Sequence, residues 1–375
     1  MSPAPLNLIQ QIHSAGVKLV YEFTGAGSLA LTWLHSVGGS SRTVLEATDR
    51  YAFASLNDLL GHPPTKPVSS AASGAMAAAA HLRALRLVGD QTRCIGVGCT
   101  ATIATDYAKR GDHACHVAVH DGRSVRTLCL VLVKCARDRT AEETMVAEMV
   151  VRAIAQAVGI DDPAPLALVE GESLQEYTSP ETDPVRLLLH AAARWVTVHF
   201  DGRRVIEEPM DGVIFSGSFN PLHEGHLGLA EAAAKALGRP LAFELPVVNA
   251  DKPQLSEAEI ARRLTQFHGR HTVLLTRLPL FVAKAVLFPH CIFAIGHDTA
   301  ERLLDPRYYG SEPARDAALA QIAEHDCRFI VAGRARAGVF HTLMDLKVPH
   351  SFKDLFLNLP DFRNDISSSA IRAQR

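Results

Sequence analysis

The sequence predicts an α/β protein with two α/β domains, the second built on a doubly wound parallel sheet. Three observations lead to this prediction. The chain has 375 residues, a length that suits two domains. Its 47% hydrophobic and 21% charged residues are ordinary for a globular protein with well-filled cores. From residue 212 onward, short apolar runs alternate with helix-like segments, a pattern typical of parallel strands joined by helical crossovers.

Composition predicts the domain boundaries. Residues 1–160 form one α/β domain by this interpretation, and residues 208–375 form the second. Between them, residues 161–207 begin with segments rich in Asp, Glu and Pro, which are typical of a linker or connecting segment.

The first domain is expected to mix helices and strands. Apolar spacing, capping residues and glycine stops predict helices at 6–15, 70–87 and 140–158, with a further helix starting at Ser28. Strands are predicted at 17–23, 93–97, 114–120 and 126–134. The stretch from His120 to Arg123, between the last two strands, has the composition of a tight hairpin turn.

The second domain alternates more regularly. Strands are predicted at 212–215, 241–248, 272–276, 292–295 and 328–332, and helices at 225–237, 256–267, 280–287 and 313–324. In a doubly wound sheet, ligands bind outside the carboxyl ends of the strands at the topological switch point. The first of these strands ends at Ser216, Gly217 and Ser218, so we expect these residues in that crevice.

Charge and cysteine usage narrow the class of protein. The formal net charge is -2, and the even spread of Lys and Arg does not favour nucleic-acid binding. The seven cysteines contain no Cys-x-x-Cys pair, so their spacing predicts reduced thiols and no zinc site. The sequence lacks a long apolar stretch and a recognisable secretory signal. We therefore expect no membrane partner and a cytoplasmic location, with a nuclear one left open.

One stretch carries the chemistry. Residues 212–228 read GVIFSGSFNPLHEGHLG, which predicts a strand, a glycine turn and a helix N-terminus with His223 and His226 at the turn. The first backbone N–H groups of a helix have no intrahelical partner, and the helix dipole adds positive potential there. This arrangement suits a bound phosphate.

These residues resemble a known family. GSFNPLHEGH, at 217–226, is similar to the signature G-x-F-[DN]-P-x-H-x-G-H of the HxGH nucleotidyltransferases, whose fold is Rossmann-like. Residues 366–372, ISSSAIR, resemble the second signature, I-S-S-T-x-I-R, and residues 296–298 resemble the G-x-D element. Two such motifs in the right order are far more specific than a lone His-x-Gly-His. The FNPxH form, together with ISSxxIR, points to the nicotinate or nicotinamide mononucleotide adenylyltransferase branch.

The resemblance implies a reaction and a set of site residues. A mononucleotide phosphate attacks the α-phosphate of ATP, pyrophosphate leaves, and the dinucleotide made belongs to NAD biosynthesis, with Mg²⁺ carried mainly by the phosphates. His223, His226 and Arg372 are the implied catalytic residues, because they can neutralise charge on the phosphates. The implied nucleotide-binding residues are Ser216, Gly217, Ser218, Phe219, Gly225, Lys252, Gly296, Asp298, Ile366, Ser367 and Ser368.

Three further positions are weighed by the same resemblance. Arg263 is a weaker candidate for phosphate contact, with a solvated surface charge as the alternative. Many relatives stack a tryptophan on the pyridine ring shortly after the G-x-D element, but this chain has none there. Tyr308 and Tyr309 lie in that stretch, and we expect ordinary half-buried aromatic residues rather than a stacking platform.

The first domain resembles the CinA C-terminal family, whose members hydrolyse the amide of nicotinamide mononucleotide. The similarity follows 21–30, 37–41 and 96–98. Phe23 stands where the family has a serine, Leu56 where it has a lysine, and Cys99 lies in a loop that departs from the family's T-G-I-A-G-P. These replacements predict a domain without amidohydrolase activity, because function depends on site residues and not on fold. Packing, homo-oligomerisation or binding of a pyridine nucleotide are its expected roles.

Two other functions stay open at this point. The chain could transfer a nucleotide to another phosphomonoester, or from CTP. Alternatively, it could be a non-catalytic pyridine-nucleotide-binding protein, for which the altered first domain is a precedent. Retention of both phosphate-facing motifs favours an enzyme.

Overall fold

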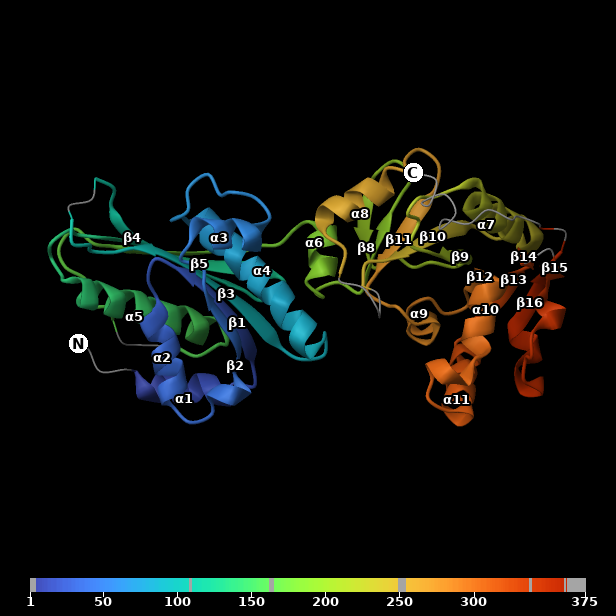
Figure 1. The fold of residues 1–375 in the computed structure, drawn as a ribbon, viewed down its shortest axis with the longest axis horizontal. Helices are drawn as coiled ribbons and strands as arrows, with labels where there is room; N and C mark the ends of the chain where they lie inside the picture. Colours follow the sequence, from blue (N-terminus) through green and yellow to red (C-terminus); the bar gives the residue numbers. More distant parts are fainter. Residues whose placement is uncertain are drawn as a thin grey trace. The chain divides into compact units, whose positions relative to one another are not determined.

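The computed structural model describes residues 5–107, 110–161, 165–248, 254–336, 339–360 and 362. The chain divides into two compact units, called here the first unit (1–183 and 190–192) and the second unit (184–189 and 193–375). Figure 1 shows both as mixtures of helices and strands. Among the described residues, no helix combines the length and the apolar character needed to cross a membrane.

The first unit is a mixed sheet of order β2-β1-β3-β4-β5-β6, with parallel pairing of β1 to β2 and β3 and antiparallel pairing from β3 to β6. Its strands are β1 Lys18–Thr24, β2 Val44–Asp49, β3 Cys94–Thr102, β4 His113–His120, β5 Ser124–Leu132 and β6 Leu174–Pro180. Its helices are α1 Leu6–Ser14, α2 Ser28–Ser36, α3 Phe53–Leu60, α4 Ser70–Val88 and α5 Arg139–Ala157.

Helices cover both faces of this sheet. Successive side chains of a strand point to opposite faces. In β1, Leu19 and Tyr21 join the core formed with α1, α2 and α5, whereas Val20 joins a smaller core with Ala80 and Ala84 of α4. The first unit is therefore a three-layer structure, and the prediction of an α/β domain is confirmed.

Glycines in β3 let α4 lie directly on the sheet. A Cβ at Gly96 would be 2.0 Å from the Ala77 carbonyl oxygen, and one at Gly98 would be 2.2 Å from the Ser73 carbonyl oxygen. Only glycine leaves room for a backbone-to-backbone approach of this kind. The small residues of α4 and the glycines of β3 thus form one close contact.

The second unit is an eight-stranded sheet of order β16-β13-β12-β9-β10-β11-β7-β8. Its strands are β7 Trp195–Val198, β8 Arg204–Ile206, β9 Val213–Ser216, β10 Leu241–Pro246, β11 Thr272–Thr276, β12 Ile292–Gly296, β13 Arg328–Ala332 and β16 Phe356–Leu359, and a separate hairpin holds β14 Arg334–Arg336 and β15 Val339–His341. Its helices are α6 Pro184–Leu189, α7 Glu224–Leu237, α8 Glu257–Leu264, α9 Phe281–Leu287, α10 His297–Leu304 and α11 Glu312–Glu324.

Strand order confirms the doubly wound fold. The six strands from β16 to β11 are parallel, and β9 lies between β10 and β12. Chain order reverses between β9 and β12, which is the switch point of such a sheet. The predicted strands and helices of this unit are present, with ends shifted by up to three residues.

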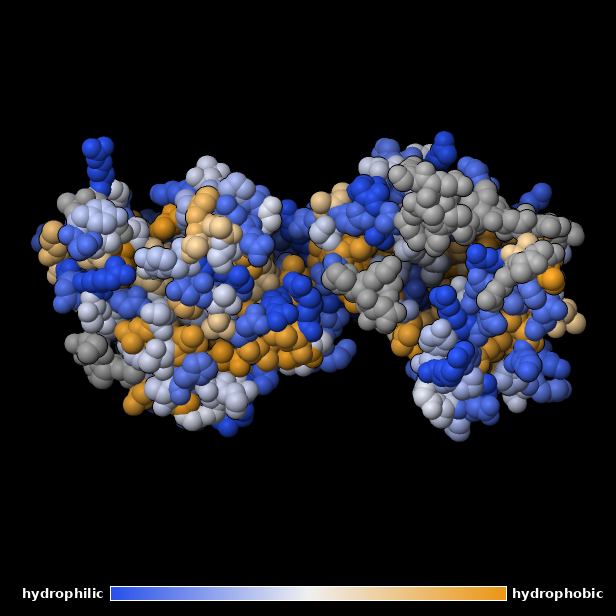
Figure 2. Space-filling model, viewed as in Figure 1, coloured by the Kyte–Doolittle hydropathy of each residue, from blue (hydrophilic) through white to orange (hydrophobic). Residues whose placement is uncertain are grey.

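The segment 161–207, which the sequence predicts to be a linker or connecting segment, contains strands of both sheets. It contributes β6 to the sheet of the first unit, and β7 and β8 to the sheet of the second. Six of the seven residues of β6 are exposed, so this edge strand lacks the apolar alternation by which strands are recognised. On the face shown in Figure 2, hydrophilic and hydrophobic side chains are interspersed over each unit.

Candidate functional site

The site is built on the strand-turn-helix that the motif predicted. Strand β9 ends at Ser216, and α7 begins at Glu224 with His223 in extended conformation at its N-cap. The Gly217 N–H donates to the Glu244 carbonyl oxygen of β10 at 3.0 Å, so the turn starts with its backbone still tied to the sheet. The predicted residues of this turn therefore lie at the carboxyl end of β9, beside the switch point.

Two imidazoles stack at the start of α7. The ring centroids of His223 and His226 are 3.7 Å apart with an interplanar angle of 20°. Phe219 packs against His226 edge-on at 5.3 Å. The Nδ1 atom of His226 is buried and has no hydrogen-bond partner within the described part of the chain.

Burial sets the charge of these rings. It lowers the pKa of His223, and together with the neighbouring His223 it lowers the pKa of His226 to about 4. Both rings are therefore neutral at pH 7 in the ligand-free protein. A neutral imidazole can donate one hydrogen bond, and an anion beside it would raise its pKa again.

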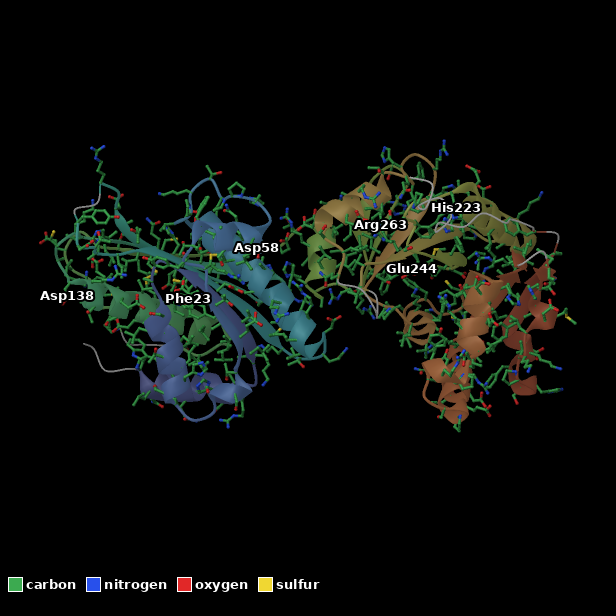
Figure 3. The ribbon with its side chains drawn as sticks, viewed as in Figure 1. Phe23, Asp58, Asp138, His223, Glu244 and Arg263 are labelled. Carbon is green, nitrogen blue, oxygen red and sulfur yellow. The ribbon has the colours of Figure 1, made fainter. Side chains whose placement is uncertain are left out.

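Side chains from α8 and the residues after it hold the turn in shape. Arg263 donates from Nη1 to the Ser218 carbonyl oxygen at 2.9 Å and from Nε to Glu259 at 2.7 Å. It was expected to be free for phosphate or for solvent. The structure instead gives it a buried positioning role beneath the turn, and Figure 3 shows it in the same part of the unit as His223 and Glu244.

Gln266 also holds the turn, and the sequence analysis did not identify this residue. Its Oε1 accepts from the Leu222 N–H at 2.8 Å, and its Nε2 donates to the Phe219 carbonyl oxygen at 3.0 Å. One amide therefore satisfies backbone groups on both sides of the cis peptide bond between Asn220 and Pro221.

A buried ion pair lies behind the turn. Lys284 of α9 donates to Glu244 of β10 at 2.7 Å, with 3% and 0% of their side chains exposed. The Lys284 amine also donates to the Ser216 hydroxyl at 3.3 Å, and the Thr276 hydroxyl donates to Glu244. This network joins the ends of β9, β10 and β11. Its signal in the sequence was a charged residue inside each of two apolar segments.

The G-x-D element lies on the other side of the switch point. Gly296 ends β12, and Asp298 lies in the first turn of α10, where its carboxylate pairs with Arg334. A cavity of about 530 Å³ adjoins this pair. Its lining is mostly charged and comprises Asp298, Glu301, Arg302, Asp305, Arg307, Tyr308, Arg334 and Ala335.

The two tyrosines differ in their surroundings. The Tyr309 hydroxyl donates to the Leu303 carbonyl oxygen at 3.1 Å, which fits the expected half-buried residue. Tyr308 is 66% exposed and lines the 530 Å³ cavity, so its ring is accessible. The cavity thus has one exposed aromatic ring at its edge.

Five predicted site residues, Lys252, Ile366, Ser367, Ser368 and Arg372, lie outside the described residues. The described part ends close to α7: a ring atom of Phe362 is 3.2 Å from the position that a Cβ on Gly228 would take. The Phe362 side chain therefore packs against α7.

The first unit shows how its altered positions are used. Phe23 is 5% and Leu56 2% exposed, so both replacements are core residues that cannot act as a base or hold phosphate. At the N-terminus of α2, the Glu143 carboxylate accepts from the N–H groups of Gly27 and Leu29 at 3.0 and 2.9 Å. The chain itself thus supplies an anion to these donors.

Comparison with known proteins identifies part of the chain. Residues 214–374 match the family model of cytidylyltransferase-like proteins, so the second unit contains a cytidylyltransferase-like domain. No curated protein matches the chain in sequence.

Similar solved structures include proteins of two kinds. The competence/damage-inducible protein CihA from Agrobacterium tumefaciens is 20% identical over 42% of this chain and 98% of its own, with a TM-score of 0.32. A competence-damaged protein (CinA) superfamily protein from Escherichia coli is 13% identical over 40% and 89%, with a TM-score of 0.33. The nicotinic acid mononucleotide adenylyltransferase of Plasmodium falciparum is 13% identical over 44% and 83%, with a TM-score of 0.28.

Proposed function

We propose that the second unit is a nucleotidyltransferase that transfers AMP from ATP to nicotinate or nicotinamide mononucleotide. The observation that carries this proposal is the stacked pair of His223 and His226 at the N-terminus of α7, at the carboxyl end of β9. The match to a cytidylyltransferase-like domain supports nucleotidyl transfer in general. The FNPxH and ISSxxIR signatures support the adenylyl donor and the pyridine mononucleotide acceptor.

The proposed step is a direct displacement. An oxygen of the acceptor phosphate forms a bond to the α-phosphorus of Mg²⁺–ATP, and the bond from that phosphorus to the bridging oxygen breaks, releasing pyrophosphate. The protein has to align two anions and stabilise the charge that develops between them. His223 and His226 supply hydrogen bonds from the side of α7, where the helix dipole also favours negative charge.

Other residues have proposed supporting roles. Ser367, Ser368, Arg372 and Lys252 are the donors that we assign to the triphosphate by the signatures. Asp298 would accept from a ribose hydroxyl, and its pairing with Arg334 holds the carboxylate at the edge of the cavity. Lys284, Gln266 and Arg263 act indirectly, because they hold the turn that the phosphates would contact.

We also propose that the first unit does not hydrolyse nicotinamide mononucleotide. Apolar side chains fill two of the positions where the resembled family has polar ones, and Glu143 already binds the N-terminus of α2. Release of ammonia from nicotinamide mononucleotide by the full chain would contradict this part of the proposal.

The experiment for the second unit is a donor-by-acceptor panel. The full chain is incubated with Mg²⁺ and ATP or CTP, and with nicotinate mononucleotide, nicotinamide mononucleotide or other phosphomonoesters, and pyrophosphate and dinucleotide are measured. We expect turnover with ATP and a pyridine mononucleotide. CTP is the second candidate donor, because the matching family model is cytidylyltransferase-like. ATP binding without product from any acceptor would favour a non-catalytic protein and contradict the proposal.

A further inference from the structure

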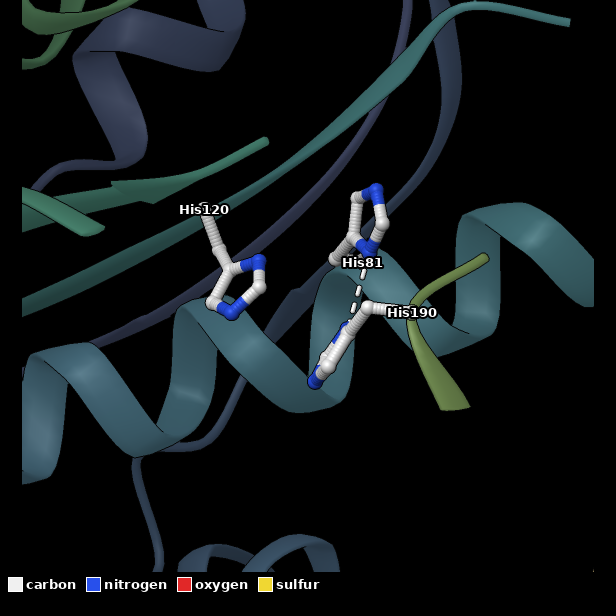
Figure 4. Close-up of side chains that lie close together, drawn as sticks. All are labelled: His81, His120 and His190. Carbon is white, nitrogen blue, oxygen red and sulfur yellow. Dashed lines mark hydrogen bonds between the residues drawn. The ribbon is translucent and has the colours of Figure 1, made fainter. Parts of the chain in front are cut away.

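Three buried histidines meet in the first unit, outside every site described above. His81 lies on α4, His120 ends β4, and His190 lies in the short segment 190–192 that belongs to this unit. Their exposed fractions are 2%, 2% and 6%. One ring nitrogen of each lies within 4.8 Å of one from each of the others, and Figure 4 shows the three rings close together, with a hydrogen bond between His81 and His190.

Glycines bring these side chains together. Gly96 of β3 pairs with His120 across the sheet, and a Cβ on Gly96 would be 2.2 Å from the backbone nitrogen of His81. Gly122 follows β4 with a φ of +94°, and a Cβ there would be 3.0 Å from the His190 carbonyl oxygen. A side chain at either glycine would push the histidines apart, so the cluster depends on this local backbone.

We propose that His81, His120 and His190 form a binding site for one divalent transition-metal ion of the zinc type. Imidazole nitrogen is a preferred ligand of Zn²⁺, Cu²⁺ and Ni²⁺, whereas Mg²⁺ and Ca²⁺ prefer oxygen ligands, so three buried imidazoles favour the first group of ions. This site is separate from the proposed nucleotidyl transfer, and neither depends on the other.

The spacing of His81 and His190 suits such an ion, whereas the His120 ring has to reorient. His81 Nδ1 and His190 Nδ1 are 3.0 Å apart, and two nitrogens 2.0–2.1 Å from a tetrahedral zinc are roughly 3.3 Å apart. His120 stacks on His190 with centroids 4.1 Å apart, and its Nδ1 accepts from the Gly122 N–H at 3.0 Å. An Nδ1 that accepts this hydrogen bond places the proton of the neutral ring on Nε2, so metal binding requires the His120 ring to turn out of the stack and to lose the bond from Gly122.

The expected consequence is structural. Three protein ligands leave a fourth position for water or a small anion. The ion would fasten the segment 190–192 to α4 and to the end of β4, since each of the three parts supplies one ligand. The sequence analysis predicted no zinc site from the cysteines. It could not detect this one, because the histidines are far apart in the chain and join only through the fold.

Metal binding is tested on the full chain without a histidine tag. The protein is stripped with a chelator, dialysed against Zn²⁺ or Co²⁺, and its metal content and melting temperature are measured. We expect one ion per chain and a rise in Tm on the order of 5 °C at saturating metal. If the stripped wild type takes up no stoichiometric ion, the cluster is a set of hydrogen-bonded core histidines and the proposal is overturned.

Variants assign the ion to the cluster. His81→Gln and His120→Gln should each weaken metal affinity at least about 100-fold, since even the loss of an outer hydrogen-bonding partner of a metal ligand costs 10–100-fold. His116→Gln is the matched control, because His116 lies on the same strand as His120 but outside the cluster. Unchanged affinity in both cluster variants would overturn the assignment. If a variant does not fold, the wild-type titration still decides the proposal.

Discussion

Helices α2 and α7, one in each unit, both begin with backbone N–H groups that lack an intrahelical partner, but the side chains beside these groups differ. At α2, Glu143 accepts from the N–H groups of Gly27 and Leu29 and from the Ser28 hydroxyl. At α7, the N-cap residue is His223, whose ring stacks on His226. The first helix end is neutralised by a carboxylate of its own chain, and the second is lined by neutral imidazoles. A helix N-terminus can therefore serve as an anion site only where the chain has not supplied the anion itself.

The largest expected effect is on the rate of nucleotidyl transfer, which should depend on the N-terminus of α7 and not on that of α2. His226→Ala should lower nucleotidyl transfer by about 10²–10³-fold, because it removes a donor aimed at developing phosphate charge. Glu143→Ala should leave the rate within about twofold, because Glu143 belongs to the other unit and its contacts are with the N-terminus of α2. Both are measured as pyrophosphate release at saturating substrate.

His268→Ala is the matched control for the histidine, because His268 is an exposed residue of the same unit. Circular dichroism of each variant shows whether the fold is kept. A folded His226→Ala protein with the wild-type rate would contradict the assigned site, and a large loss in Glu143→Ala would show that the two helix ends are not independent.

The second prediction concerns the buried pair behind the turn of the second unit. Lys284→Met leaves the fully buried Glu244 carboxylate without its cation, and breaking a buried pair from one side typically costs about 3–5 kcal/mol. We expect that loss in the free energy of unfolding of the second unit, measured by urea denaturation.

The double variant Lys284→Met with Glu244→Gln is the control, because it removes both charges and should recover part of the loss. Equal stability of the single variant and the wild type would mean that water reaches Glu244, and that the network does not hold the turn. Because Lys284 also contacts Ser216, the single variant should lower activity as well.

The third prediction concerns the Glu143 carboxylate at the N-terminus of α2 in the first unit. Glu143→Ala removes the carboxylate from the N-terminus of α2, and the loss of a helix cap costs about 0.5–2 kcal/mol. The freed N–H groups should then donate to an external anion. We expect phosphate to raise the Tm of Glu143→Ala more than that of the wild type, at equal ionic strength. The same response in both proteins would show that Glu143 does not block an anion site.

The sequence predicted the fold of the second unit and the position of its main motif, but not the side-chain contacts that support the site. The alternation after residue 212 predicted the doubly wound sheet, because buried parallel strands are apolar runs bounded by clear helix signals. In the first unit, the sequence analysis missed β6, since an exposed edge strand has no such pattern. The motif placed His223 and His226 at the start of α7, because strand-turn-helix geometry is local in the chain.

The supporting contacts could not be predicted, because they are long-range. Gln266 reaches back to Phe219 and Leu222, and Lys284 to Ser216 and Glu244, across segments whose mutual approach is set by the sheet order. The sequence shows only that a single charged residue lies within an apolar strand or helix. The partner of that charge becomes known only with the fold.

The smallest expected effect concerns pH and the stacked histidines. The pKa of His226 is about 4 in the folded protein, below the ordinary value near 6.5, so the unfolded chain binds the proton more readily. Stability should therefore fall as the pH is lowered from about 6.5 toward 4, and level off below that. His226→Asn should remove about 1 kcal/mol of this pH dependence, allowing for solvent screening of a partly exposed ring. The measurement is the difference in unfolding free energy between wild type and variant from pH 7 to pH 4, with His268→Asn as the control. An unchanged slope would mean that the folded and unfolded chains bind this proton equally well, and that burial does not hold the His226 ring neutral.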